Sequence, residues 1–285
     1  MKETEIKKTV REKYGSIAKQ SAPSQVQNCG CTPAPATACC GSPPGITNSI
    51  SKTIGYSDED LNSVPEGANL GLGCGNPVAL ASLKAGETVL DLGSGAGFDC
   101  FLASAKVGPA GRVIGVDMTT DMLDKARENC KKGGYKNVEF RLGEIEHLPV
   151  ADSSVDIIIS NCVINLAPDK KRVFAESFRV LKPGGRVMVS DIVLLQELPE
   201  FVKSSIDAYV GCVAGASLKG DYLAYIRNAG FKNVKVTEET VFPIEGMLND
   251  PMAQAVMKGL NMPAEKLTEL ARSVVSIKVS AVKPG

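Results

Sequence analysis

Three glycines, Gly93, Gly95 and Gly97, stand at alternate positions directly after a short apolar run at 89–92. The run is typical of a buried strand, and the mostly apolar stretch 101–107 beyond the glycines has helical character. Because glycine has no Cβ and tolerates positive φ, a turn of this kind lets a ligand lie against the backbone. Such a turn between a strand and a helix is where nucleotide-like ligands bind in α/β sheets.

A second predicted strand, 112–116, ends at Asp117, whose carboxylate is placed to accept hydrogen bonds from a ribose diol. Both a dinucleotide and S-adenosylmethionine carry a ribose, so these two patterns leave both ligands open. From Thr88 onward, apolar strands alternate with helical segments, which predicts βαβ units and a parallel sheet. The predicted strands are 88–92, 112–116, 138–142, 155–160, 186–192, 233–239 and 275–282, and the predicted helices are 98–107, 120–132, 170–181 and 218–229.

The regions on either side of this alternation differ from it in composition. Residues 6–19 carry apolar side chains at helical spacing and predict an amphipathic helix. The segment 21–50 has five prolines, four cysteines and no aromatic residue, which is typical of a linker. After the fifth strand, 194–216 is predicted to be helical and to cover the C-terminal edge of the sheet. The segment 243–273 is predicted to be a mainly helical insertion.

Net charge indicates which partners the protein binds, and cysteine content bears on the cellular compartment in which it is found. Thirty-two basic residues balance thirty-two acidic ones, so net charge predicts no binding to nucleic acid or to a membrane surface. No apolar run approaches the roughly 20 residues of a membrane span, and the charged N-terminus is unlike a secretory signal. We therefore expect a cytoplasmic protein whose nine cysteines are reduced. The lone histidine, His147, excludes a multi-histidine metal site and is predicted to lie in a loop.

Three further patterns favour S-adenosylmethionine over a dinucleotide. Residues 143–146 follow the third strand and provide an acid and an apolar residue to hold and cover an adenine ring. The fourth strand ends at Asn161, at the ligand-facing edge of the sheet. A Pro-Gly-Gly turn at 183–185 precedes the fifth strand, whereas dinucleotide enzymes lack that turn and usually space their glycines as G-x-G-x-x-G. In this order, residues 86–195 resemble the class I S-adenosylmethionine-dependent methyltransferases.

This resemblance implies an α/β fold with a Rossmann-like seven-stranded sheet, an antiparallel last strand and helices on both faces. It implies that the glycines approach the methionine part of the cofactor, Asp117 binds the ribose, and Glu144 with Ile145 surrounds the adenine. The whole implied cofactor-binding set is Asp91, Gly93, Ser94, Gly95, Gly97, Asp117, Met118, Glu144, Ile145 and Asn161. The predicted domains are 1–65, an N-terminal helix and Pro/Cys-rich linker; 66–195, the S-adenosylmethionine-binding core; and 196–285, an acceptor-side cover with C-terminal helices and strands that complete the sheet.

The cysteines divide into two groups. Cys100 and Cys130 lie in predicted helices of the sheet domain, where cysteine is usually a small, inert, buried residue. No clear helix or strand face places Cys74, Cys162 or Cys212 in the core, and glycines neighbour Cys74 and Cys212. Cys162 follows the fourth strand, and Cys212 lies in the segment expected to cover the same edge. These three cysteines are therefore expected to converge on one cleft.

Pieces along nearly the whole chain resemble the arsenite S-adenosylmethionine methyltransferases. They are 10–15, Cys39-Cys40, 72–77, 91–99, 160–166 and the segment around Cys212. The resemblance implies that Cys162 and Cys212 bind trivalent arsenic, with Cys74 as a third ligand or redox partner, and that a cysteine near Cys39 and Cys40 takes part in a disulfide relay. It also implies arsenite or its thiol conjugates as substrate and a thiol reductant of the thioredoxin or glutathione type. Longer members of the family carry a further C-terminal domain.

The chemistry of arsenic agrees with this reading. Trivalent arsenic is soft, so thiolates suit it as ligands, and its lone pair can attack a sulfonium methyl without prior deprotonation. Two alternatives remain open. A methyltransferase of a small organic acceptor, such as a quinone precursor, has no use for the three cysteines, and a non-catalytic thiol-based metalloid-binding protein has no need of the cofactor pocket. The four linker cysteines are also compatible with zinc, although the paired C-x-x-C spacing is absent.

Overall fold

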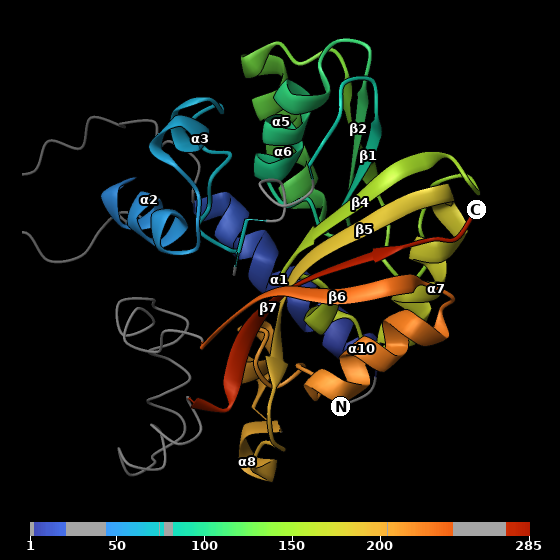
Figure 1. Cartoon of the computed structure of the whole chain (residues 1–285). Coiled ribbons are helices and arrows are strands. Elements are labelled where there is room, and N and C mark those ends of the chain that lie inside the picture. Colours follow the sequence, from blue (N-terminus) through green and yellow to red (C-terminus); the bar gives the residue numbers. More distant parts are fainter. Residues whose placement is uncertain (1–2, 21–43, 74, 77–81, 204, 242–271) are drawn as a thin grey trace, which may run out of the picture.

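A central sheet with helices on both faces organises the chain (Figure 1). The computed structural model describes residues 3–20, 44–73, 75–76, 82–203, 205–241 and 272–285. The strands are β1 (Thr88–Leu92), β2 (Arg112–Asp117), β3 (Val138–Leu142), β4 (Val155–Asn161), β5 (Leu181–Leu194), β6 (Lys232–Val241) and β7 (Val274–Val282). The helices are α1 (Glu3–Gln20), α2 (Pro44–Thr53), α3 (Asp58–Asn62), α5 (Phe98–Val107), α6 (Thr120–Gly133), η1 (Ile164–Leu166), α7 (Lys170–Val180), α8 (Glu200–Lys203), α9 (Ile206–Val210) and α10 (Lys219–Asn228).

The sheet has the strand order β3-β2-β1-β4-β5-β7-β6. The first five strands run parallel, and β7 runs antiparallel to both of its neighbours. This confirms the predicted seven-stranded α/β architecture with one antiparallel strand. The chain order reverses between β1 and β4, and in parallel sheets the carboxyl ends of the strands at such a point form a ligand-binding crevice.

Two apolar cores result from side chains that alternate between the faces of each strand. On one face, Val89 and Ile157 pack against α5 and α6. On the other, Leu90 and Ile158 pack against Phe174 of α7 and α10. Helices cover both faces of the sheet. The central strands therefore carry apolar side chains on both faces, as expected for a parallel sheet.

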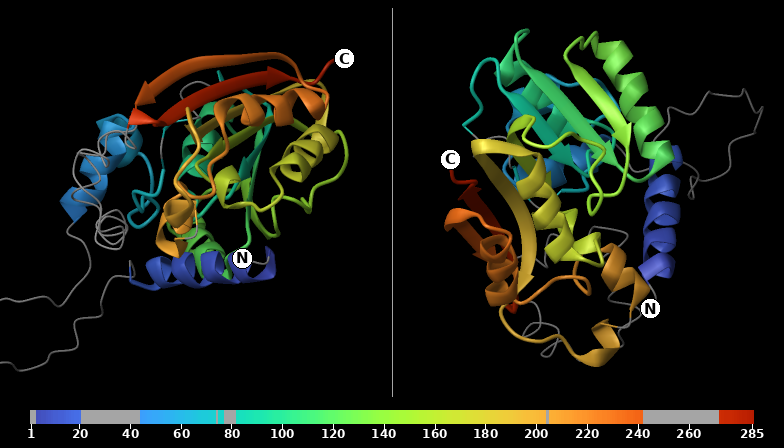
Figure 2. Two further views of the ribbon diagram at one scale, coloured as in Figure 1. Left: turned by 90° about the horizontal axis from the view of Figure 1, so that it is seen from below. Right: turned by 90° about the vertical axis from the view of Figure 1, so that its right-hand side faces the viewer.

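The N-terminal helix α1 packs beside α6 and crosses the carboxyl ends of the strands (Figure 2). Its buried face includes Lys7 and Val10, and Tyr14 on the same face is half-buried. The predicted amphipathic helix is therefore confirmed. Its position over the strand ends brings a segment from the start of the chain to the site that the sheet builds.

Several sequence predictions were wrong in their details. The linker was predicted to reach residue 50, but α2 already begins at Pro44, because proline suits the first turn of a helix. The segment 194–216 was predicted to be helical, but its described part has only the short helices α8 and α9, and turns follow α9 at 211–215. Strand β5 is longer than predicted at both ends, because Leu181 pairs with β4 and β7 pairs with β5 up to Leu194. Most of the predicted helical insertion, at 242–271, lies outside the described residues.

Candidate active site

The glycine turn after β1 has the strained conformation that its sequence predicts. Gly93, Gly95 and Gly97 have φ values of 68°, 51° and 94°, a region that favours glycine. Gly93 and Ser94 donate their N–H groups to the carbonyl of Val116, at 2.8 and 3.0 Å, which ties the turn to β2. A Cβ on Gly95 would meet no atom within 4 Å. The turn therefore presents bare backbone to the pocket that Gly93 and Gly95 line.

We expect Gly97→Ala to destabilise the protein more than Gly134→Ala, although both glycines have left-handed backbones. A Cβ at position 97 would lie 2.8 Å from the rings of Phe101 and Phe140, whereas one at position 134 meets nothing within 4 Å. The left-handed backbone lowers the free energy of unfolding of an alanine variant by about 1–2 kcal/mol at either site. Overpacking lowers it by roughly a further 1–3 kcal/mol at position 97 alone. Urea unfolding of the two variants measures the difference, and equal losses would contradict the packing argument.

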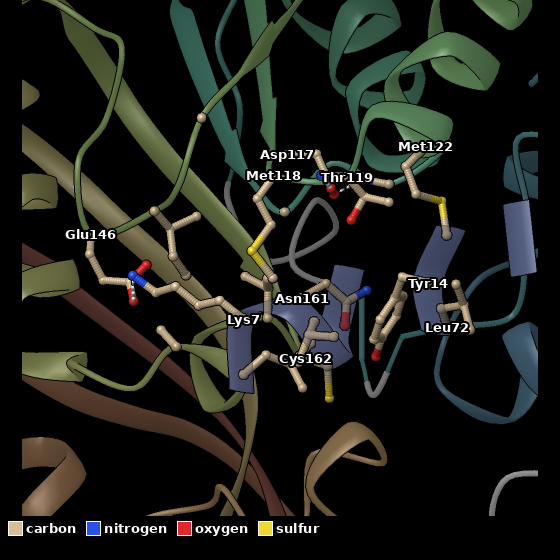
Figure 3. Close-up of a pocket in the computed structure, with 18 of the residues that line it drawn as sticks. Lys7, Tyr14, Leu72, Asp117, Met118, Thr119, Met122, Glu146, Asn161 and Cys162 are labelled. Atoms are coloured by element: carbon tan, nitrogen blue, oxygen red, sulfur yellow. Dashed lines mark hydrogen bonds and ion pairs between the residues drawn. The ribbon is translucent and has the colours of Figure 1, made fainter. Parts of the chain in front are cut away.

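Asp117 supports the same turn from the end of β2. Its Oδ2 accepts a hydrogen bond from the N–H of Gly95 at 2.9 Å, and its Oδ1 accepts one from Thr119 at 2.8 Å. Burial raises the pKa of this carboxyl, and the backbone donors offset part of the rise. The Thr119 side chain and the backbone of Met118 also hydrogen-bond to this carboxylate. The side chain lines the pocket beside Met118 (Figure 3).

Two buried acids, Asp91 and Asp99, lie close to Asn161, which lines the pocket. Asp99 accepts a hydrogen bond from the hydroxyl of Tyr56 at 2.7 Å, and the Asn161 amide donates to the same hydroxyl at 2.8 Å. Burial raises the pKa of Asp99 to about 6, while the bonds from Tyr56 and Asn161 oppose the rise. Asp91 is fully enclosed beside Cys100, and burial and the charge of Asp99 raise its pKa well above the usual value. Buried carboxyls of this kind are stabilised as anions when a cation binds next to them.

Glu144 and Glu146 hold α1 over the site. The ammonium of Lys7 lies 2.8 Å from Glu144 and 3.2 Å from Glu146 (Figure 3), and Arg11 approaches Glu144 at 3.6 Å. Although burial opposes it, hydrogen bonds to Glu144 and Glu3 raise the pKa of Lys7, so this lysine stays charged. The Glu144 carboxylate, predicted to hold the adenine, is therefore also an anchor for α1.

The cavity has two connected parts. A partly open chamber of about 90 Å³ includes Tyr14, Asn161 and Cys162 among its walls. An open groove of about 530 Å³ runs past Arg11 and Glu144, and it shares Met118, Thr119 and Gly143 with the chamber. A chamber beside a groove that carries charged side chains such as Arg11 and Glu144 suits an elongated ligand.

Cys162 and Cys212 come together from different parts of the chain. Cys162 follows β4 and lines the chamber, and the Cys212 thiol donates to the carbonyl oxygen of Cys162 at 3.0 Å. Both residues have left-handed backbones, with φ values of 60° and 62°. Non-glycine residues in that conformation cost about 1–3 kcal/mol each and cluster at functional sites. Cys162 is disulfide-bonded, so the expectation that all nine cysteines are reduced is wrong for this residue, whereas Cys100, Cys130 and Cys212 carry free thiols.

The surroundings of Cys212 in this structure keep its thiol protonated. Burial and the nearby Asp191 raise the pKa of Cys212 to about 12, although Tyr14 and Lys170 oppose the rise. Asp191 is itself buried, and burial raises its pKa to about 7. Hydrogen bonds from Asn165 at 2.8 Å and Tyr222 at 3.0 Å hold the Asp191 carboxyl in place. The Cys212 thiol therefore has a buried, hydrogen-bonded acid as its neighbour.

The structure brings together most of the predicted site residues. Those that line the two parts of the cavity are Gly93, Gly95, Asp117, Met118, Glu144, Ile145, Asn161 and Cys162. Asp91 and Ser94 are buried in and beside the turn, and the Ser94 hydroxyl is an orphaned buried polar atom. The predicted residues Cys39, Cys40 and Cys74 lie outside the described residues, as do the other linker cysteines.

Two expectations about cysteines need correction or refinement. Cys162 and Cys212 were not expected in the core, but they are only 7% and 6% exposed, because α1 and the segment after β5 enclose them. Cys100 is fully buried as predicted, whereas Cys130 is half-buried. Among the residues that the structure describes, no group of three or more acidic, histidine or cysteine side chains has the geometry of a metal site. The predicted loop position of His147 is confirmed, and the residue is exposed.

Lys7, Tyr14 and Tyr56 are parts of the site that the sequence analysis missed. A signal for the first two was present, because Lys7 and Tyr14 share the helical face of Val10 in the predicted amphipathic helix. Nothing in the sequence around Tyr56 indicates its contact with Asp99, which is 43 residues further along the chain. None of the helices in the described ranges has the length and apolar character required to cross a membrane.

Comparison with known proteins gives consistent matches. A methyltransferase domain family model matches residues 83–230. An arsenite methyltransferase of Halobacterium salinarum is 53% identical over 232 residues, which is 81% of this chain and 59% of that protein. The mouse arsenite methyltransferase is 33% identical, with 95% of this chain and 71% of the mouse protein covered. This chain therefore spans about three fifths of the length of the Halobacterium relative.

A solved structure also matches over most of the chain. It is an arsenic(III) S-adenosylmethionine methyltransferase from Chlamydomonas reinhardtii, with a TM-score of 0.62 and 33% sequence identity. The match covers 86% of this chain and 75% of the algal one. Sequence and fold thus point to the same group of proteins.

Proposed function

This chain belongs to the arsenite methyltransferase family, and we propose that it transfers the methyl group of S-adenosylmethionine to trivalent arsenic held by cysteine thiolates. The products are methylated arsenicals and S-adenosylhomocysteine. The observation that carries the proposal is the position of Cys162, which lines the chamber and accepts the hydrogen bond of the Cys212 thiol at 3.0 Å. Soft trivalent arsenic prefers such sulfur ligands.

The residues of the cavity fit the proposed cofactor. The bare backbone at Gly95 and the Asp117 carboxylate, both of which line the chamber, supply groups for its polar parts. The buried carboxyls Asp91 and Asp99 suit a ligand that carries positive charge. When bound, S-adenosylmethionine supplies a methyl group on a sulfonium, an electrophile that requires no activation by a base.

The protein's own task is then to hold arsenic and to exclude water. The arsenic lone pair is the nucleophile, so the residues align and desolvate it rather than remove a proton from it. Val10, Met118 and Leu166 supply apolar walls for the chamber. This mechanism agrees with a chain whose one histidine is exposed and does not line either part of the cavity.

We further propose that thiols supply the electrons that turnover requires. Methyl transfer raises arsenic formally from the trivalent to the pentavalent state, and two thiols that form a disulfide return two electrons. The disulfide-bonded state of Cys162 supports such chemistry, because this residue must be reduced before it binds arsenic. Cys74, Cys39 and Cys40 are the proposed relay partners, and a thioredoxin- or glutathione-type reductant resets them. A cytoplasmic location would keep these thiols reduced.

In the direct test, the pure protein is incubated with arsenite, S-adenosylmethionine and a thiol reductant, and the arsenic species formed are then identified. Methylated arsenic that is absent without the methyl donor is the expected result. Tight arsenite binding without methylation would instead favour a metalloid-binding protein. If arsenite neither binds nor reacts, the acceptor is a small organic molecule and the proposal is wrong.

We expect S-adenosylmethionine affinity to fall as the pH drops below about 6. Burial raises the pKa of Asp99 to about 6, so this carboxyl is anionic at pH 7.5 and increasingly neutral at pH 5.5. Loss of that charge removes an attraction for the cationic cofactor, and binding of the cofactor releases a proton near this pH. Isothermal titration between pH 5.5 and 8 measures the effect. In Asp99→Asn the fall should be smaller, and an unchanged pH profile in that variant would contradict the assignment.

A further inference from the structure

Tyr56 joins the segment between α2 and α3 to the wall of the chamber. Its hydroxyl donates a hydrogen bond to Asp99 at 2.7 Å and accepts one from the Asn161 amide at 2.8 Å. The same amide nitrogen donates to Asp99 at 3.3 Å, so the three side chains form a closed ring of hydrogen bonds. Asn161 lines the chamber (Figure 3), whereas Tyr56 is only 4% exposed and does not line it.

We propose that Tyr56 is a positioning residue for S-adenosylmethionine, whose hydroxyl fixes the Asn161 amide and the Asp99 carboxylate in the arrangement that binds the cofactor. This inference rests on the proposed function of the site, because it takes S-adenosylmethionine as the ligand of the chamber. It adds a residue that acts on the cofactor only through its two hydrogen-bond partners.

The neighbours of the Tyr56 ring give its hydroxyl a defined place. The ring makes an edge contact with Phe98, with centroids 4.8 Å apart, and Phe98 begins α5 directly before Asp99. The backbone N–H of Tyr56 donates to the carbonyl oxygen of Ser51 in α2 at 3.1 Å. The ring is also part of the apolar cluster that includes side chains of α5 and α6. Because packing already orders this ring, its hydroxyl forms two hydrogen bonds at little further entropic cost.

The hydroxyl determines which way the Asn161 amide faces. An amide nitrogen only donates hydrogen bonds, and an amide oxygen only accepts them. The Asn161 nitrogen donates to the carbonyl oxygen of Gly75 at 2.7 Å as well as to Tyr56. If the amide turned over, its oxygen would face the Gly75 carbonyl, and the one proton of the Tyr56 hydroxyl could not serve both that oxygen and Asp99. Gly75 and Tyr56 thus select one orientation of the amide in the chamber wall.

The hydroxyl also stabilises the Asp99 anion. Hydrogen bonds from Tyr56 and Asn161 lower the pKa of Asp99, while burial raises it. The other titratable groups that interact with Asp99 are Asp60 of α3, Asp91 of β1 and Cys100 of α5. Two acids and a buried thiol supply no positive charge, so the stabilisation of the anion comes from its two donors. Loss of the Tyr56 hydroxyl is then expected to neutralise Asp99 at a higher pH.

Tyr56→Phe tests the proposal, because phenylalanine keeps the ring and removes only the hydroxyl. Isothermal titration of the full-length protein with S-adenosylmethionine, in the absence of arsenite, measures the Kd between pH 5.5 and 8.5. We expect the Kd at pH 7.5 to rise about tenfold, as the loss of one hydrogen bond to a charged group implies.

Tyr135→Phe is the matched control. Tyr135 packs against the same apolar cluster, and its hydroxyl donates to the carbonyl oxygen of Ser63 at 3.4 Å, outside both parts of the cavity. The Kd for S-adenosylmethionine should stay within about twofold of the unmodified protein in this variant. A loss equal to that of Tyr56→Phe would overturn the assignment.

The pH profile distinguishes positioning from a general structural fault. The fall in affinity expected below about pH 6 should begin about one pH unit higher in Tyr56→Phe, because the Asp99 anion then lacks one of its two donors. In an Asp99→Asn protein, adding Tyr56→Phe should change the Kd by less than about threefold, since the charged partner is already absent.

An unshifted pH profile in Tyr56→Phe, or losses that simply add in the double variant, would overturn the role of Tyr56. If the expected shifts are found but the unmodified protein fails to methylate arsenite, the proposed function fails and the role of Tyr56 stands. Arsenite methylation by the unmodified protein together with normal cofactor binding in Tyr56→Phe would have the opposite meaning.

Discussion

Replacing Cys162 or Cys212 by serine is expected to abolish arsenite methylation while S-adenosylmethionine binding persists. A serine hydroxyl is similar in size but is a hard, weakly acidic oxygen that soft trivalent arsenic binds poorly. We expect a loss of activity of roughly 100-fold or more, because even residues that only support a metal ligand are worth about 10–100-fold. Arsenic speciation measures the activity, and isothermal titration measures cofactor binding.

Cys130→Ser is the matched control for both cysteine variants. Its thiol lies on α6, half-buried, 3.4 Å from the carbonyl oxygen of Tyr135. Serine and cysteine have similar backbone preferences, so the left-handed conformations of Cys162 and Cys212 add no new strain to either variant. Full activity in both Cys162→Ser and Cys212→Ser would exclude the thiolate mechanism. A loss of activity in Cys130→Ser as well would indicate a general fault of folding.

Asp117→Ala is expected to weaken S-adenosylmethionine binding by roughly 10–100-fold, in line with the loss of hydrogen bonds to a charged group. The change removes the acceptor proposed for the ribose hydroxyls. It also releases the N–H groups of Gly95 and Thr119, which the carboxylate holds at 2.9 and 2.8 Å. Arsenite binding by the cysteines should survive, the reverse of the result expected for the cysteine variants.

Asp124→Ala provides the comparison for Asp117. Asp124 is an exposed acid on α6, close in sequence but outside both parts of the cavity. Its removal changes the net charge by the same amount without touching the glycine turn. Titration calorimetry at one ionic strength compares the two variants, and normal affinity in Asp117→Ala would show that the ribose is held elsewhere.

The core of the fold was predictable because its signals are local and repeated. Strand β1, the glycine turn and α5 follow one another within 20 residues, and each has a strong pattern of its own. The turn glycines were recognisable because their positive φ values exclude most other residues. Asp117 was predictable for the same reason, since its place at the end of β2 follows from the strand pattern.

The cover over the site was harder to predict. Between β5 and α10 the chain has only short helices, and their positions depend on packing against distant residues such as Val10. Local periodicity is weak in such a segment, so the prediction that 194–216 is helical holds only for the short helices α8 and α9. Cys212 was identified as a site residue, but its burial depends on α1, which lies almost 200 residues earlier in the chain.

The sequence by itself determined the order of strands and helices, the glycine turn with its acid, and the cysteines that suit arsenic chemistry. These features depend on residue type and on spacing within single elements. Only the tertiary structure decided that α1 closes the chamber, that Tyr56 meets Asp99, and that Tyr14 lies beside the Cys212 segment. These contacts join residues far apart in the chain, and their partners are selected by the packing of whole elements, which local patterns do not encode.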